Sequence, residues 1–186
     1  MKIQGILLIT VGLTFALWMS WGLYSIYSTG RPPYQVVDSL SSQVEIRQYE
    51  QQTWISTSHE TDDSSFLVLA SYIFGRNVER EKVAMTAPVI TAAKMSFILP
   101  EGLSKNNAPT PDGQAMDFTT VAARRLATLQ FSWLTSESRV EQKTAELLAT
   151  LQVHGIGTKG SPFLMRYNDP WTPPFLRRNE MAIEVE

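Results

Sequence analysis

The sequence predicts an α+β domain, a distorted antiparallel β-barrel or sheet with two flanking helices, built from two similar halves. Three observations support this prediction. After residue 33, the order strand, strand, helix, strand, strand occurs twice, with about 75 residues between equivalent elements. The expected strands alternate apolar and polar residues or are β-branched and aromatic, whereas the expected helices contain apolar residues at helical spacing. About 155 residues follow the apolar N-terminal segment, which is enough for one domain with a core.

The first element is an uncharged apolar segment, residues 3–27, between Lys2 and Arg31. At about 1.5 Å per helical residue, it covers the roughly 30 Å hydrocarbon core of a bilayer. Aromatic residues, which favour a membrane interface, gather at its C-terminal end: Trp18, Trp21, Tyr24 and Tyr27. The sequence therefore predicts a single-pass transmembrane anchor in residues 1–30, followed by one domain in residues 31–186.

A cleaved signal sequence is the alternative for residues 1–30. Such a sequence has an apolar region of about 7–15 residues and then a small-x-small cleavage site. The segment here is longer, and residues 25–30 make a poor cleavage site, so we expect a retained anchor. Because Lys2 and the amino terminus are positively charged, the positive-inside rule favours a cytoplasmic N-terminus and an extracytoplasmic domain.

The first half of the domain contains two strands, a helix and two further strands. Thr61, Asp62 or Asp63 can cap the helix, and Gly75 offers a left-handed stop after it. Pro88 lacks a backbone donor, which puts its strand at an edge or a bulge. The expected ranges are 44–49 and 53–57 for the first strands, about 62–74 for the helix, and 83–92 and 94–99 for the last strands.

The second half follows a polar loop, residues 101–117, and has the same order of elements. Its helix carries an apolar stripe on one side, Ser138 and Glu141 have the spacing of a capping box, and Gly155 is expected to end it. The expected ranges are 118–123 and 126–133 for the first strands, 138–153 for the helix, and 163–167 and 181–185 for the last strands.

The helix of the first half is apolar on almost every side. Phe66, Leu69, Ala70 and Ile73 share one face, with further apolar residues on both flanks. A sheet that wraps around the helix, or contact with the anchor or a membrane, would explain this pattern. The functional alternative is a groove beside the helix that holds a flat apolar ligand.

Several segments resemble the SOUL/haem-binding-protein family. They include VEIRQY at 44–49, WIST at 54–57, the helix to GRN at 75–77, KVAMTAPV at 82–89, SFILP at 96–100, YNDP at 167–170, Pro173-Pro174 and RNEM at 178–181. The resemblance covers about residues 34–186, and the order Met-Thr-Ala-Pro-Val is its most specific part. It implies a distorted antiparallel β-barrel with two flanking helices, and it implies binding of haem or other tetrapyrroles in an apolar groove near the first helix. No enzymatic activity is shared across this family, whose fold also resembles effector-binding modules of bacterial regulators.

A haem site needs an apolar slot, cations for the propionates and, in many proteins, an axial ligand. The resemblance and the apolar helix together indicate non-covalent, b-type haem beside that helix, with Arg76 or Lys82 near a propionate. The alternative for these cations, together with Arg80, is a solvated loop, since Glu79 and Glu81 lie between them. The expected contact residues are Leu67, Val68, Tyr72, Phe74, Arg76, Lys82 and Met85.

His59 is the candidate axial ligand because it precedes the apolar helix. Its alternative is an exposed histidine in a loop between a strand and a helix. His154 lies in the last turn of the second helix, where the helix dipole favours a cation, so a capping role explains it. Met85, Tyr72 or no protein ligand at all remain open as alternatives.

The predicted function is a membrane-tethered, non-enzymatic haem- or tetrapyrrole-binding protein for capture, buffering or transfer of haem. The alternative is a ligand-sensing or protein-interaction module that uses the same groove for another apolar ligand. The chain has no cysteine, which excludes cysteine nucleophiles, iron–sulfur clusters and Cys-ligated zinc. Its net charge of −2 argues against wholesale nucleic-acid binding. It also contains no HExxH, phosphate-binding loop or nucleophile elbow.

Overall fold

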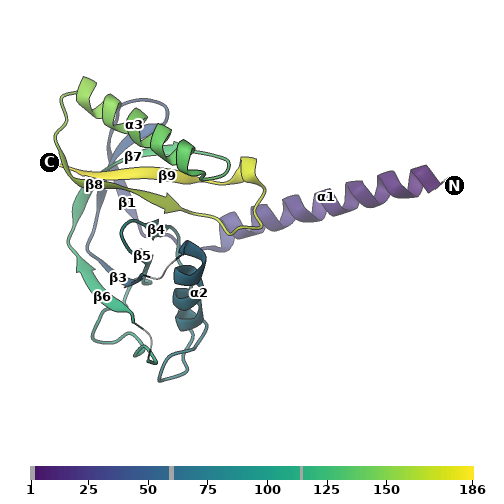
Figure 1. Cartoon of the computed structure of the whole chain (residues 1–186), viewed down its shortest axis with the longest axis horizontal. Coiled ribbons are helices and arrows are strands. Elements are labelled where there is room, and N and C mark those ends of the chain that lie inside the picture. The colour runs from purple at the N-terminus through teal and green to yellow at the C-terminus, as the bar shows by residue number, and fades with distance from the viewer. Residues whose placement is uncertain (1–2, 59–60, 114) are drawn as a thin grey trace.

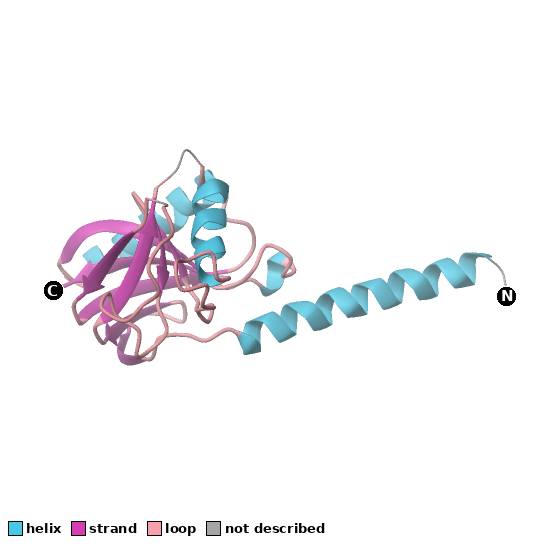
Figure 2. Cartoon of the chain, turned by 90° about the horizontal axis from the view of Figure 1, so that it is seen from below, coloured by secondary structure: helices cyan, strands magenta, loops and turns pink. Residues whose placement is uncertain are grey.

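The computed structural model describes residues 3–58, 61–113 and 115–186. Within these residues, a long helix, α1 (Ile3–Ser28), precedes a nine-stranded sheet with two further helices, α2 (Asp62–Ile73) and α3 (Glu137–Val153). α1 extends away from the sheet in both views (Figures 1 and 2). Over Leu8–Ser28 it is long and apolar enough to cross a membrane. The helix predicted for residues 3–27 is therefore present.

The strands of the described residues form one curled, antiparallel sheet. In the sheet they follow the order β1-β2-β7-β9-β8-β4-β5-β3-β6. β1 and β6 stay at the two ends, so the sheet does not close into a barrel. The strand bounds are β1 (Tyr34–Ser39), β2 (Val44–Tyr49), β3 (Gln52–Thr57), β4 (Val89–Thr91), β5 (Met95–Ile98), β6 (Asp117–Val121), β7 (Arg124–Phe131), β8 (Thr158–Arg166) and β9 (Asn179–Val185), and a 3-10 helix covers Pro174–Leu176.

The two halves of the chain make matching parts of this sheet. The first half contributes β3, β5 and β4 with α2, and the second contributes β7, β9 and β8 with α3. β4 pairs with β8 and joins the two parts. The first strand of each half is exchanged, since β2 pairs with β7 and β6 pairs with β3. The α+β class and the two similar halves are thus confirmed.

β1 was not predicted from the sequence. Its residues 35–39 are exposed, because the strand lies at the end of the sheet and pairs only with β2. Residues 34–39 consequently lack the strong apolar alternation on which the other strand predictions rested.

The strand predicted for residues 83–92 is wrong for most of its length, since β4 covers only Val89–Thr91. The preceding segment is a loop that returns from α2. Its backbone is held by Asn77, whose amide nitrogen donates to the carbonyls of Tyr72 and Glu81 at 3.1 and 2.6 Å. Pro88, which follows a cis peptide bond, precedes the strand instead of interrupting it, because β4 begins at Val89.

The predicted caps of α2 are present, whereas the predicted N-cap of α3 is not. Thr61 is the N-cap of α2, where its side chain accepts from the N–H of Ser64, and Gly75 follows the helix with a φ of +98°. The capping box at Ser138 is wrong, because α3 begins one residue earlier, after Ser136, and has no side-chain cap. The second half otherwise follows the prediction, although β8 begins at Thr158 instead of residue 163.

Buried apolar residues form three clusters. One lies between α3 and the sheet around Leu129, Leu147 and Ile183, and a second lines the curled sheet around Ile98 and Met165. The third lies between α2 and strands β3, β4 and β5. Each helix therefore fixes the strands of its own half.

Candidate functional site

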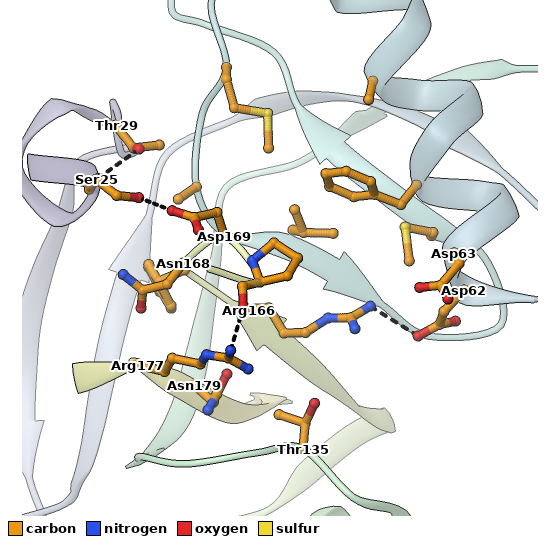
Figure 3. A pocket seen from close by; sticks show the side chains of 18 of the residues that line it. Ser25, Thr29, Asp62, Asp63, Thr135, Arg166, Asn168, Asp169, Arg177 and Asn179 are labelled. Atoms are coloured by element: carbon orange, nitrogen blue, oxygen red, sulfur yellow. Dashed lines mark hydrogen bonds and ion pairs between the residues drawn. The ribbon is translucent and has the colours of Figure 1, made fainter. Parts of the chain in front are cut away.

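A cavity of about 460 Å³ lies beside α2. One wall is α2, and strands β4 and β5 with the segment before them contribute Met85, Val89 and Met95. The opposite wall is the segment that follows β8, together with the C-terminal end of α1 (Figure 3). The volume lies in the range of small-molecule and cofactor sites.

The α2 wall combines two carboxylates with an apolar stripe. Asp62 and Asp63 line it at the N-terminal end of the helix. The stripe consists of Phe66, Ala70, Ile73 and Phe74, whose spacing of four, three and one residues puts them along one side of the helix. Phe66 is fixed by an edge-on contact with the buried ring of Phe97, at 5.6 Å between ring centres. Phe74 is 70% exposed, so its ring lies at the rim of the cavity, free to cover a ligand.

Two arginines contribute positive charge to the cavity. The Arg166 guanidinium donates to Asp62 at 2.9 Å and to the hydroxyl of Thr91 at 2.8 Å (Figure 3). Arg177 donates to the carbonyl oxygens of Pro170 and Thr172 at 2.6 and 2.8 Å. Because the Arg166–Asp62 pair is partly exposed, it is worth at most about 1 kcal/mol, and an anionic ligand group can replace Asp62 as the partner.

Asp169 connects the cavity wall to α1. Its carboxylate accepts from the N–H groups of Trp171 and Thr172 at 2.7 and 3.0 Å, and from the Ser25 hydroxyl of α1. Burial alone would raise the pKa of Asp169, but the hydrogen bonds from Ser25 and from the two backbone groups hold it below its ordinary value. Asp169 therefore holds α1 as an anion at neutral pH.

Tyr167 lines the cavity but is tied to a buried ionic group. Its hydroxyl donates to Glu180 at 2.8 Å, and Glu180 also pairs with Arg47 and Arg178 at 2.8 and 2.6 Å. Burial, followed by the charge of Glu180, raises the pKa of Tyr167 well above its ordinary value. The phenolate form that would bind iron is thus disfavoured at this position.

The residues predicted from the sequence divide into two groups. Phe74 and Met85 line the cavity. Leu67, Val68, Arg76 and Lys82 are not among the lining residues, and Leu67, Arg76 and Lys82 are exposed to solvent.

Tyr72 is a core residue and not a groove residue, which corrects its predicted place. Its side chain is fully buried in the α2 cluster, and its hydroxyl donates to the carbonyl of Pro109 at 2.7 Å. Burial raises its pKa to about 12. The loop between β5 and β6 covers this side of α2, and the cavity lies on the opposite side of the helix.

His154 is not among the described residues that line the cavity. His59 lies outside the described residues. His154 is exposed at the end of α3, with Nδ1 2.8 Å from the carbonyl oxygen of Thr150, which agrees with a capping role. Among the described lining residues, the groups that could ligate iron are Met85, Met95 and Tyr167.

Several cavity residues were not predicted as site residues. Phe66, Ala70 and Ile73 were assigned only to the core face of α2, and Arg166, Tyr167, Asn168 and Asp169 come from the other half of the chain. The string YNDP at 167–170 was part of the family resemblance, and that was the signal that could have indicated this wall.

The curled sheet, the two helices and an apolar cavity with arginines at its side define an α+β domain with a small-molecule pocket. A family model described as SOUL heme-binding protein matches residues 29–184. The chain therefore belongs to the SOUL heme-binding protein family. The matched region begins directly after α1.

Two solved structures share the fold at low sequence identity. The C-terminal domain of EcmrR has a TM-score of 0.52 and 14% identity, covering 82% of this chain and 98% of that domain. A hydrolase from Listeria innocua has a TM-score of 0.53 and 8% identity, covering 86% of this chain and 94% of its own. A comparison with curated proteins gave no match.

Proposed function

We propose that this protein is a membrane-anchored, non-enzymatic protein that binds haem non-covalently in the cavity beside α2, for capture, buffering or transfer. In this proposal residues 1–30 are the anchor and residues 31–186 are the haem-binding domain. The observation that carries it is the apolar stripe of α2, which faces a cavity with Arg166 and Arg177 in its other walls. Membership of a heme-binding family supports the same ligand.

The chemistry of the walls suits a b-type haem or a related tetrapyrrole. Such a molecule has a flat apolar ring system and two carboxylates. Phe66, Ala70, Phe74 and Met85 supply apolar surface for the ring. Arg166 is the better propionate partner of the two arginines, because its bonds to Asp62 and Thr91 use one guanidinium nitrogen, whereas Arg177 donates to backbone carbonyls from two. This assignment replaces Arg76 and Lys82, which lie outside the cavity lining.

Bound haem would supply an iron that can take an axial ligand. Met85 is the candidate among the described residues, because Met95 is buried and Tyr167 is held as a neutral phenol by Glu180. His59 stays a prediction from the sequence. We expect binding to depend mainly on apolar contacts and propionate pairing, so His59→Ala should keep both hemin binding and the Soret position.

Hemin titration of the full chain in detergent tests the proposed ligand. The test variant is Phe74→Glu, and the matched control is Leu67→Glu, because Leu67 is similarly exposed on α2 at 67% but does not line the cavity. A charge at the cavity rim should weaken hemin binding about tenfold or more, which corresponds to about 1.4 kcal/mol. Equal affinities of the two variants, or saturable binding of another apolar ligand without any Soret change, would contradict the haem proposal.

The membrane anchor is tested separately. We expect the mature protein to retain residues 1–30 with the N-terminus in the cytoplasm, since Lys2 and the amino terminus are the positive groups before α1. The mass of the protein purified from membranes shows whether residues 1–30 are still present. A mass that corresponds to cleavage near residue 30 would contradict the retained anchor. Protease treatment from the outer side should degrade the domain and leave α1 protected in the bilayer.

A further inference from the structure

An exposed apolar surface lies beside the C-terminal part of α1. It comprises Trp133 and Leu134 after β7 and the loop 170–176, and we call it the α1-side surface. Trp171 is 74% exposed, and the ring of Trp133 lies 6.4 Å from that of Phe175. Large exposed aromatic residues gathered in one place mark an interaction site.

Three contacts fix this surface to one side of α1. The indole N–H of Trp18 donates to the carbonyl oxygen of Trp171 at 2.7 Å. A Cβ atom at Gly22 would lie 2.7 Å from Pro173, so the loop packs against the glycine itself. The Ser25 hydroxyl donates to Asp169. Residues 18, 22 and 25 share one helix face, so the loop follows the helix instead of touching it at one point.

The contacts lie in the C-terminal half of α1. A hydrocarbon core of about 30 Å takes about 20 helical residues. α1 has 26 residues, so a span that begins at Ile3 ends near Gly22, at the level of the loop, whereas the apolar window Leu8–Ser28 brings the loop to the edge of the hydrocarbon. The exposed rings of Trp18, Trp21 and Tyr24 lie at this level as well.

The backbone of the loop is satisfied by protein groups. Each carbonyl oxygen from 170 to 174 accepts a hydrogen bond: that of Pro170 and that of Thr172 from Arg177, and that of Trp171 from Trp18. The carbonyl oxygens of residues 173 and 174 accept from backbone N–H groups. The N–H groups of Trp171 and Thr172 are bound by Asp169. Because the carbonyls of residues 170–174 are bound, this part of the loop can approach an apolar medium at a lower cost from unsatisfied polar groups.

We propose that the α1-side surface rests in the interface of the bilayer that α1 spans, with Trp171 and Phe175 at the boundary of headgroups and acyl chains. The inference rests on the anchor in the proposed function and adds a second contact with the lipid. The cavity then borders the membrane, because Ser25, Asp169 and Pro170 line it and belong to the same junction. Two contacts hold the orientation of the domain, whereas a single flexible tether would leave it free to turn.

Spin labels on introduced cysteines test this proposal. The chain has no cysteine of its own, so each variant of the full-length protein carries one label. The variants are Trp171→Cys, Phe175→Cys, Leu13→Cys in the middle of α1 and Val153→Cys at the exposed end of α3. Replacement of Trp171 keeps the hydrogen bond to Trp18, because that bond uses the carbonyl group. All four side chains are exposed, so the labels replace no core residue.

The proteins are reconstituted into phosphatidylcholine and phosphatidylglycerol vesicles, and the accessibility of each label to oxygen and to a water-soluble nickel complex is measured. We expect labels 171 and 175 within about 5–10 Å of the headgroup boundary, label 13 in the hydrocarbon and label 153 in water. Label 13 in lipid with labels 171 and 175 as water-accessible as label 153 would overturn this inference and leave the anchor intact. Label 13 in water would overturn the anchor, and the inference with it.

Discussion

Helices α3 and α2 stand at equivalent places in the two halves, and each packs on strands of its own half. α3 buries Leu147 and Leu151 against the sheet, and Lys143 and Glu146 form an ion pair at its surface. α2 buries Leu69 and Tyr72 in the same manner, but its remaining sides are also apolar and one of them borders the cavity. On one common topology, the sequence pattern of the helix therefore sets which half borders a cavity.

The cover of α2 comes from segments distant in the sequence. Ser25 of α1, Thr29 directly after it and residues 166–170 form the wall opposite to it. These segments are held together by Asp169, which binds α1 and the loop at the same time. The α3 half is closed by its own helix, whereas the α2 half depends on the other half and on the anchor.

The comparison predicts that the largest loss of stability arises in the α3 half. Leu147→Ala removes a fully buried side chain and should lower the free energy of unfolding by about 2–5 kcal/mol. The control is Leu148→Ala, at the next and more exposed position of the same helix. Urea unfolding in detergent measures both. A loss for Leu147→Ala that does not exceed the loss for Leu148→Ala would show that Leu147 does not pack α3 against the sheet.

A larger side chain that fills the cavity should weaken hemin binding with little effect on the fold. Ala70→Phe puts an aromatic ring into the space beside α2 and should weaken hemin binding about tenfold or more, or about 1.4 kcal/mol. The same change at Ala145, an exposed position of α3, should leave the hemin affinity unchanged. Circular dichroism checks that both variants fold. Loss of binding in both variants would show that the effect is not specific to the α2 side.

A pair of arginine variants tests which cation binds the haem propionates. Arg166→Gln removes one of the two positive charges that line the cavity. It should weaken hemin binding up to about fivefold, because a partly exposed pair of an arginine and a propionate is worth about 1 kcal/mol. Arg76→Gln removes the exposed cation predicted from the sequence and should have no effect. If the two results are reversed, the propionates lie at the C-terminal end of α2 and not at β8.

The smallest expected effect is a pH dependence at the junction of α1 and the loop. The pKa of Asp169 is lowered in the folded protein, so its contribution is complete above its ordinary value of 3.8 and is lost as the pH falls below it. Thermal unfolding between about pH 2 and pH 5 should show a steeper decline for the wild type than for Asp169→Asn. Parallel curves would mean that Asp169 does not hold the junction as an anion.

The order of elements was predictable because local periodicity reports helices and strands. The N-cap at Thr61, the apolar excess of α2 and the lengths of both domain helices follow from patterns within a few residues. The exposed edge strand β1 and the irregular return from α2 to β4 were missed, since neither has a periodic signal.

The side of α2 that faces the cavity was not predictable from the helix alone. Val68 with Tyr72 and Leu67 with Phe74 are equally apolar flanks in the sequence. The loop between β5 and β6 covers the first flank through Pro109 and partly buried residues such as Leu103 and Met116. Residues of the second half, more than 90 positions away, form the cavity wall. The spacing of residues within one helix does not report contacts with segments that are distant in the sequence.

The two halves exchange their first strands in the sheet, and the slight sequence identity between the halves does not reveal this exchange. β2 belongs to the first half but completes the second, and β6 does the reverse. Two separate copies of one half would meet this requirement only as a domain-swapped dimer, in which each copy lends its first strand to the other. The present chain has the architecture of such a dimer fused into one polypeptide. Its pseudo-twofold symmetry is incomplete, since α3 packs on the sheet over Leu147 and Leu151 whereas α2 borders the cavity.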